Sequence, residues 1–158
     1  MKQKVLSLLV DNTSGVLSRI SGMFSRRGFN INSLTVGETE NPKFSRMTVT
    51  VTCDDRVLTQ IKNQINKLED VVEVTELYDG SSVCRELVLV KVKADMKEKQ
   101  DIIAMANVYR ANIVDVSPES LMIELTGSTS KIEAFINLLN GFEIKEFVRT
   151  GLTGLPRG

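Results

Sequence analysis

The sequence contains no histidine, and its only two cysteines, Cys53 and Cys84, lie far apart. Without an imidazole the chain has no Ser–His or Cys–His arrangement and no histidine for acid–base catalysis. Two separated cysteines provide no disulfide framework, no zinc-ligand spacing and no thioredoxin-like pair. Cys53 is in phase with the apolar residues before it, which predicts a small buried hydrophobe. These absences favour a protein of a reducing cytoplasm that binds no metal.

Aromatic residues are scarce, and neither sign of charge dominates. Tryptophan is absent, aromatic residues make up 5% of the chain, and 20 Lys and Arg balance 20 Asp and Glu. Proteins that bind nucleic acid usually carry a basic surface with stacking aromatics, so this composition argues against such a partner. The apolar run over 5–10 is short and interrupted by Ser7, which predicts neither a signal peptide nor a membrane span. We expect a soluble, cytoplasmic protein.

The apolar pattern of the first half predicts the order βαββαβ. Strict alternation over 44–53 has the period of two that is typical of a strand. An apolar stripe over 16–26 has helical spacing and stops before Gly28, and Asp54-Asp55 is a typical helix N-cap. We expect strands over 5–10, 29–36, 44–53 and 71–77, and helices over 16–26 and about 57–68.

The second half repeats the same order. Asn30-Ile31 of the first copy matches Asn112-Ile113 of the second, and the helix and strand patterns recur around them. We expect strands over 86–94, 111–116, 120–126 and 142–148, and helices over 97–110 and after a Ser-Thr-Ser cap at 128–130.

The repeat predicts an α+β protein made of two tandem ferredoxin-like βαββαβ domains. The first is expected over 1–79 and the second over 86–158, with a polar linker at 80–85. A domain of about 75 residues buries little surface, so association between the halves or between chains is expected.

One loop distinguishes the two copies. In the first copy, Asp11-Asn12-Thr13-Ser14-Gly15 leads from the first strand into the first helix. These residues suit a helix N-cap, and they also suit a site where an anion meets the first backbone N–H groups of a helix. The second copy has a lysine-rich segment over 93–98 in the same place, without the glycine or the hydroxyls. This asymmetry favours a ligand in the first copy alone.

Groups for catalysis are largely missing. No Walker loop, dinucleotide fingerprint or paired-carboxylate site is present. One enzymatic alternative on this fold is an acylphosphatase-like hydrolase, which uses a phosphate loop with a nearby arginine. Here the nearest arginine, Arg19, falls inside the first helix instead of the loop.

The residues resemble a known family. The segments over 11–17, 27–36 and 45–48 are similar to an ACT domain, and more narrowly to the regulatory (small) subunit of acetolactate synthase. The resemblance continues through 85–92 and reaches the tail at 149–158, so it covers essentially the whole chain. Asp11 stands where a glutamate is expected, a change that keeps the charge.

The resemblance implies a chain with no catalytic site and no cofactor of its own. The family's catalytic subunit is a separate protein that uses thiamine diphosphate, Mg²⁺ and FAD to make acetolactate from pyruvate, in branched-chain amino-acid biosynthesis. The small subunit raises its activity and confers feedback inhibition by valine, and in some members by leucine or isoleucine. The second domain, at 86–158, is expected to contact the catalytic subunit.

The same resemblance implies the effector site. The positions tied to valine response are Asn12, Gly15 and Asn30, and neighbouring residues are expected to line the same pocket. The backbone N–H groups of the loop would receive the carboxylate, and the asparagine amide oxygens would accept from the ammonium group. The expected effector-binding residues are Asn12, Thr13, Ser14, Gly15, Val16, Leu17, Asn30 and Ile31.

The family's effector lies between the ACT domains of a homodimer, so we expect the strands over 29–36 of two copies to pair edge to edge. Branched-chain amino acids that differ by one methylene are separated by only about 1–3 kcal/mol in such a pocket. A second alternative is an ACT-domain amino-acid sensor that regulates a different enzyme.

Overall fold

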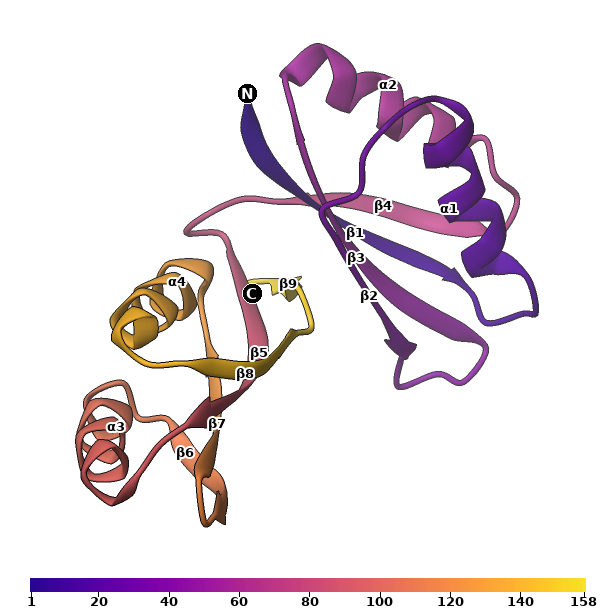
Figure 1. The fold of residues 1–158 in the computed structure, drawn as a ribbon. Helices are drawn as coiled ribbons and strands as arrows, with labels where there is room; N and C mark the ends of the chain where they lie inside the picture. The colour runs from indigo at the N-terminus through magenta and orange to yellow at the C-terminus, as the bar shows by residue number, and fades with distance from the viewer. The chain divides into compact units, whose positions relative to one another are not determined.

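A computed structural model describes all 158 residues, and the chain divides into two compact units (Figure 1). Unit 1 comprises residues 1–84 and 151–158, and unit 2 comprises residues 85–150. Each unit is built of helices packed on an antiparallel sheet, which confirms the predicted α+β class. The second domain was expected to run from 86 to 158, but the last eight residues pack within unit 1.

Unit 1 has the predicted βαββαβ order. Its sheet has the strand order β2-β3-β1-β4, with every neighbouring pair antiparallel, and α1 and α2 cover one of its faces (Figure 1). The elements are β1 (Lys2–Asp11), α1 (Val16–Arg26), β2 (Ser33–Glu38), β3 (Phe44–Cys53), α2 (Asp55–Asn66) and β4 (Val71–Leu77).

Alternating side chains build the core of unit 1. Leu6 and Leu8 of β1 lie opposite Val49 and Met47 of β3, and all four are fully buried beneath the helices. Burial of one such side chain stabilises the fold by about 1.5–3 kcal/mol. The helix-facing core comprises Leu6, Leu8, Val10, Val16, Ile20, Met23, Phe24, Met47, Val49, Val51, Cys53, Leu58, Ile61 and Ile65.

The second strand begins four residues later than the prediction of 29–36. Phe29 donates its backbone N–H to Phe24 O, and the two rings pack edge to face with centroids 6.3 Å apart. These contacts hold Phe29 against the end of α1, next to Gly28 with its φ of 70°. Pairing with β3 therefore starts only where Asn32 N–H donates to Thr50 O, and β2 continues to Glu38.

The C-terminal tail crosses the sheet face of unit 1 that the helices leave open. Thr35 Oγ1 of β2 donates to Leu152 O at 3.2 Å, and Leu152 is buried. A Cβ on Gly151 would lie 2.5 Å from Ser33 Cβ, and one on Gly154 would lie 3.0 Å from a Leu77 methyl carbon. The tail includes a short strand, β9 (Thr153–Pro156), that pairs with β5 (Ser82–Lys93), whose first three residues belong to unit 1. The sequence patterns did not predict this strand.

Unit 2 repeats the same architecture, with α3 and α4 on one face of its sheet (Figure 1). The strand order is β6-β7-β5-β8, which matches the order in unit 1. The elements are β5 (Ser82–Lys93), α3 (Met96–Val108), β6 (Asn112–Ser117), β7 (Ser120–Gly127), α4 (Thr129–Leu138), a 3-10 turn (Leu139–Gly141) and β8 (Ile144–Arg149).

The segment expected to be a linker at 80–85 is mostly strand. β5 begins at Ser82 because the tail supplies backbone partners there, including Arg157 N–H, which donates to Ser81 O. The helix expected over 97–110 ends earlier, at Val108. Arg110 takes a positive φ of 57°, and Ala111 N–H turns back to donate to Ala106 O.

Candidate functional site

The loop between β1 and α1 is fixed by hydrogen bonds at its start. Asp11 N–H donates to Asp70 O, and Asn12 N–H donates to Lys43 O, both at 2.8 Å. The Asn12 side chain adds two bonds, since Nδ2 donates to Glu38 Oε1 at 3.0 Å and to Pro42 O at 2.9 Å. The loop is thus held between the turn before β4 and the β2–β3 hairpin, and the Asn12 amide oxygen is left as an acceptor.

No side chain caps α1. Its N-cap residue is Gly15 in the left-handed conformation, with a φ of 86°, and no side-chain hydrogen bond reaches the first turn. The interpretation of Asn12, Thr13 and Ser14 as simple capping residues is therefore wrong. The first turn also has no acidic residue, so the partial positive charge of the helix end is not balanced from within the helix. Such an end suits an anionic group.

The corresponding loop of unit 2 is closed by its own side chains. Asp95 Oδ1 accepts from Glu98 N–H at 2.8 Å, and Glu98 Oε1 accepts from Asp95 N–H at 3.2 Å. This capping box satisfies two N–H groups of α3 and places a carboxylate at its positive end. The sequence repeat predicted a difference between the two loops, and the structure shows it. The first turn of α3 has its own carboxylates, whereas the first turn of α1 has none.

Arg19 is a residue at this loop that the sequence interpretation did not assign to the site. Its guanidinium folds back over Gly15, where a Cβ would lie 2.9 Å from Nη1. Arg19 Nε donates to Asp70 Oδ2 at 2.5 Å, which raises the pKa of the arginine further above its ordinary value. The signal was present in the spacing, because residues four apart on a helix lie on the same side.

The structure brings together only part of the expected site. Leu17 is 46% exposed beside the loop, whereas Val16 is buried in the helix-facing core and does not line an open surface. Asn30 and Ile31 follow the other end of α1. A helix of 11 residues spans about 16 Å, so within one chain these two residues lie far from the loop.

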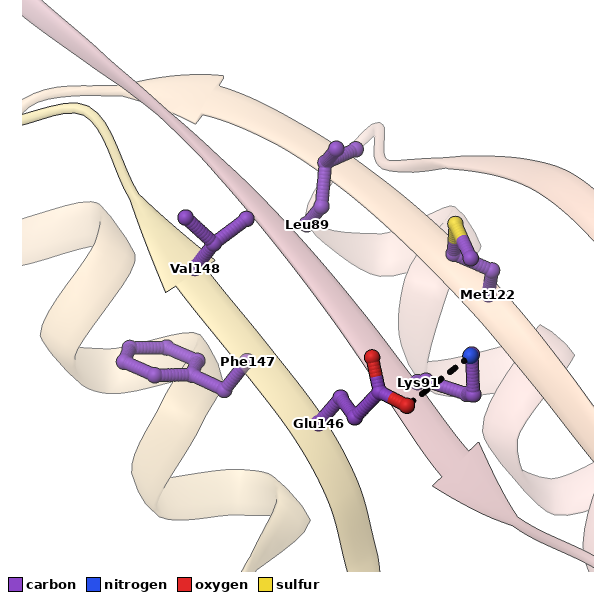
Figure 2. Close-up of a pocket in the computed structure, with 6 residues that line it drawn as sticks. All are labelled: Leu89, Lys91, Met122, Glu146, Phe147 and Val148. Atoms are coloured by element: carbon purple, nitrogen blue, oxygen red, sulfur yellow. Dashed lines mark hydrogen bonds and ion pairs between the residues drawn. The ribbon is translucent and has the colours of Figure 1, made fainter.

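Unit 2 carries a pocket on the sheet face opposite its helices (Figure 2). Its only charged groups are Lys91 and Glu146, whose side chains pair with each other at 3.3 Å. The lining residues are Leu89, Lys91, Met122, Glu146, Phe147 and Val148. No group of three or more His, Cys, Asp or Glu residues is placed to hold a metal ion. None of the helices is both long and apolar enough to cross a membrane.

Removal of the Asn12 side chain tests the role of its two hydrogen bonds to Glu38 and Pro42. The Asn12→Ala variant loses both bonds to the β2–β3 hairpin and the free amide oxygen, so we expect the affinity for the amino acid that the sequence resemblance implies here to fall about 10- to 100-fold. Calorimetric titration measures this change. The matched control is Asn63→Ala, which removes an exposed asparagine from α2. Equal affinities of Asn12→Ala and the wild type would exclude a role for this side chain.

Two family models match the chain. Residues 6–73 match the ACT domain described as AHAS small subunit-like, and residues 85–158 match a family described as the small subunit of acetolactate synthase. Together the two matches cover most of both βαββαβ repeats.

Curated relatives and a solved structure agree with these models. The probable acetolactate synthase small subunit of Methanothermobacter thermautotrophicus is 50% identical over 155 residues, which covers 98% of this chain and 92% of the relative. The acetolactate synthase isozyme 3 small subunit of Salmonella typhimurium is 42% identical over 157 residues, which covers 99% of this chain and 96% of the relative. The crystal structure of the acetolactate synthase small subunit from Thermotoga maritima is 42% identical, with a TM-score of 0.92 over 100% of this chain and 99% of that chain.

Proposed function

Because the chain belongs to the family of acetolactate synthase small subunits, we propose that it raises the activity of a separate catalytic subunit and makes that subunit sensitive to valine. The catalytic subunit would supply the thiamine diphosphate, Mg²⁺ and FAD chemistry, and this chain would bind none of these cofactors. The proposal places the complex in the cytoplasm, in agreement with two cysteines that lack any disulfide-framework spacing.

The expected site residues lie at opposite ends of α1 within one chain, and this separation supports binding between two copies of the chain. β2 is an edge strand of its sheet, and Asn12 donates to Glu38 at its C-terminal end. Asn30 and Ile31 precede its N-terminal end. When two β2 strands pair antiparallel about a twofold axis, the start of one lies beside the end of the other. The partner's Asn30 and Ile31 would thereby approach the loop at Asn12, which completes the set.

The chemistry of the loop fits a free amino acid. The uncapped first turn of α1 offers N–H donors to a carboxylate, and the Asn12 amide oxygen offers an acceptor to an ammonium group. Leu17 and the partner's Ile31 would provide apolar contacts for a branched side chain. An effector bound across the dimer favours one arrangement of the two copies, and the catalytic subunit would respond to that arrangement.

Titration of the purified chain with the twenty amino acids tests this function. We expect saturable binding of valine and weaker or equal binding of leucine and isoleucine. One effector molecule should bind at each site that two copies share. Sedimentation with and without valine should show a dimer in both cases. A monomer that binds valine tightly would contradict the shared site, and the absence of any amino-acid binding would contradict the assigned loop.

A further inference from the structure

The chain passes between its two units at two places. One passage lies at Cys84-Arg85, within β5, and the other at Thr150-Gly151, where the C-terminal tail begins. β5 follows β4 along the chain, so the first passage leaves unit 1 from the β4 edge of its sheet. The second passage reaches unit 1 at β2, which is the opposite edge and the one proposed to pair with a second copy.

Gly151 lies in close contact with β2. It has a φ of 84°, and a Cβ in its place would lie 2.5 Å from Ser33 Cβ and 2.8 Å from Ser33 Oγ. No larger residue fits this position unless β2 or the tail moves. The next residue, Leu152, is buried, and its carbonyl oxygen accepts a hydrogen bond from Thr35 Oγ1. The start of the tail is therefore packed directly against β2.

The rest of the tail runs across the sheet to the β4 edge. β9 contacts β3 and β4, and a Cβ on Gly154 would lie 3.0 Å from a methyl carbon of Leu77. Arg157 N–H donates to Ser81 O at 2.8 Å, shortly after β4 ends. Residues 151–158, called the strap below, are thus held by unit 1 from its β2 edge to its β4 edge.

Thr150, immediately before the strap, is held by unit 2. Its N–H donates to Leu87 O at 3.0 Å, and its hydroxyl oxygen accepts from Leu87 N–H at 3.1 Å. Thr150 and Gly151 are consecutive, so one peptide bond joins a residue anchored on β5 in unit 2 to a residue packed on β2. Because a peptide bond is planar and stiff, this connection has no slack that would absorb a displacement of β2.

We propose that the strap carries the effector-dependent state of β2 to unit 2. This inference rests on the proposed function, in which valine changes the pairing of two β2 strands. A shift of β2 would displace Gly151, because their contact leaves no free space, and would move Thr150 with it. β5 provides no equivalent route, since it leaves unit 1 from the opposite edge of the sheet.

A purely structural role for the strap is the competing explanation. In that case the strap would only complete the packing of unit 1, and a weaker strap would lower the stability of the β2 edge. Valine affinity and valine inhibition would then fall together. Transmission through the strap predicts that the two properties separate, so that valine still binds while the catalytic subunit responds less.

Two variants of the full chain, each in complex with the catalytic subunit from the same genome, distinguish these roles. Insertion of Gly-Gly between Thr150 and Gly151 lengthens the connection and keeps the residues of the strap. Thr35→Val removes the hydroxyl that donates to Leu152 O. We expect both variants to bind valine as the wild type does in calorimetry and to raise the catalytic rate. At saturating valine, the remaining rate should be about 3-fold or more above that of the wild type.

Matched controls place the same changes elsewhere in the chain. Gly-Gly added after Gly158 lengthens the chain beyond the strap. Thr59→Val removes an exposed hydroxyl of α2 that also donates to a backbone carbonyl, that of Asp55. We expect valine to inhibit the complexes of both controls as it inhibits the wild-type complex.

The outcomes separate this inference from the proposed function. Wild-type inhibition in the insertion variant would overturn the inference, and so would a parallel loss of valine affinity and inhibition in Thr35→Val. Either result leaves the proposed function intact. If the insertion variant does not raise the catalytic rate, Thr35→Val decides by the same comparison. A wild-type chain that confers no valine inhibition would overturn the proposed function, and this inference with it.

Discussion

Titration of the Gly15→Asp variant with valine is expected to give no saturable binding, a larger loss than any other single change in the loop. The new carboxylate would begin at a Cβ placed 2.9 Å from Arg19 Nη1. It would therefore pair with the guanidinium and cover the uncapped N–H groups of the first turn. The aspartate would occupy the position proposed for the carboxylate of the effector. Calorimetry and valine-dependent protection against thermal unfolding both measure this loss.

Backbone strain needs a separate control, because Gly15 has a φ of 86° and any other residue is unfavourable there. Gly80 has nearly the same φ, 85°, and open space around its Cα. The Gly80→Asp variant therefore carries the same strain and the same charge far from the loop, and we expect it to bind valine as the wild type does. Unchanged valine affinity in Gly15→Asp would contradict the assignment of the loop.

Chemical unfolding of the Arg149→Met variant is expected to show unit 2 destabilised by about 3 kcal/mol. Arg149 Nε and Nη2 both bond to Glu86 Oε1, and Nη1 donates to Glu133 Oε1 at 2.6 Å. The Glu86 side chain is only 4% exposed, so loss of the guanidinium leaves a buried carboxylate without its partner. The shift of the urea midpoint at constant slope measures the effect.

Two controls test this explanation. The double variant Glu86→Leu with Arg149→Met replaces the buried pair by apolar side chains and should regain most of the lost stability. Lys91→Met breaks an ion pair whose other member, Glu146, is 74% exposed, so the loss should stay below about 1 kcal/mol. A double variant no more stable than Arg149→Met would show that the destabilisation does not come from the unpaired Glu86.

Local patterns predicted most elements of the fold. The strand over 44–53 was found to its exact ends because its alternation is strict, and α1 ends where Gly28 takes a positive φ. The caps of α2 and α4 were also predicted, since Asp54 Oδ1 accepts from Val57 N–H and Ser128 Oγ accepts from Lys131 N–H. Signals of this kind involve residues close in sequence, and a single sequence carries them well.

Local patterns of this kind did not predict the contacts between segments that are distant in the sequence. The tail over 151–158 packs on unit 1 through its bond to Thr35 and through glycines at close approaches, and none of this has a local period. The late start of β2 depends on the packing of Phe29 against Phe24. These features are set by tertiary structure, which overrides the apolar pattern of a short segment.

The candidate site was predicted in part. The sequence located the loop at Asn12 and Gly15, and the structure fixes both beside open backbone donors. It did not predict that the Arg19 side chain folds back over Gly15. The resemblance implied a pocket between two copies of the chain, and in the structure α1 separates Asn30 from the loop within a single chain. That β2 lies at the edge of its sheet is a property of the topology, which residue patterns alone do not contain.

The central claim is that this chain makes a catalytic subunit responsive to valine through the loop at Gly15. The most direct test measures acetolactate formation by the catalytic subunit from the same genome as this chain and valine are added in turn. We predict that the wild-type chain raises the rate and that valine then lowers it, while Gly15→Asp still raises the rate but gives no inhibition. A rate that the chain does not change, or valine inhibition that survives in Gly15→Asp, would contradict the account.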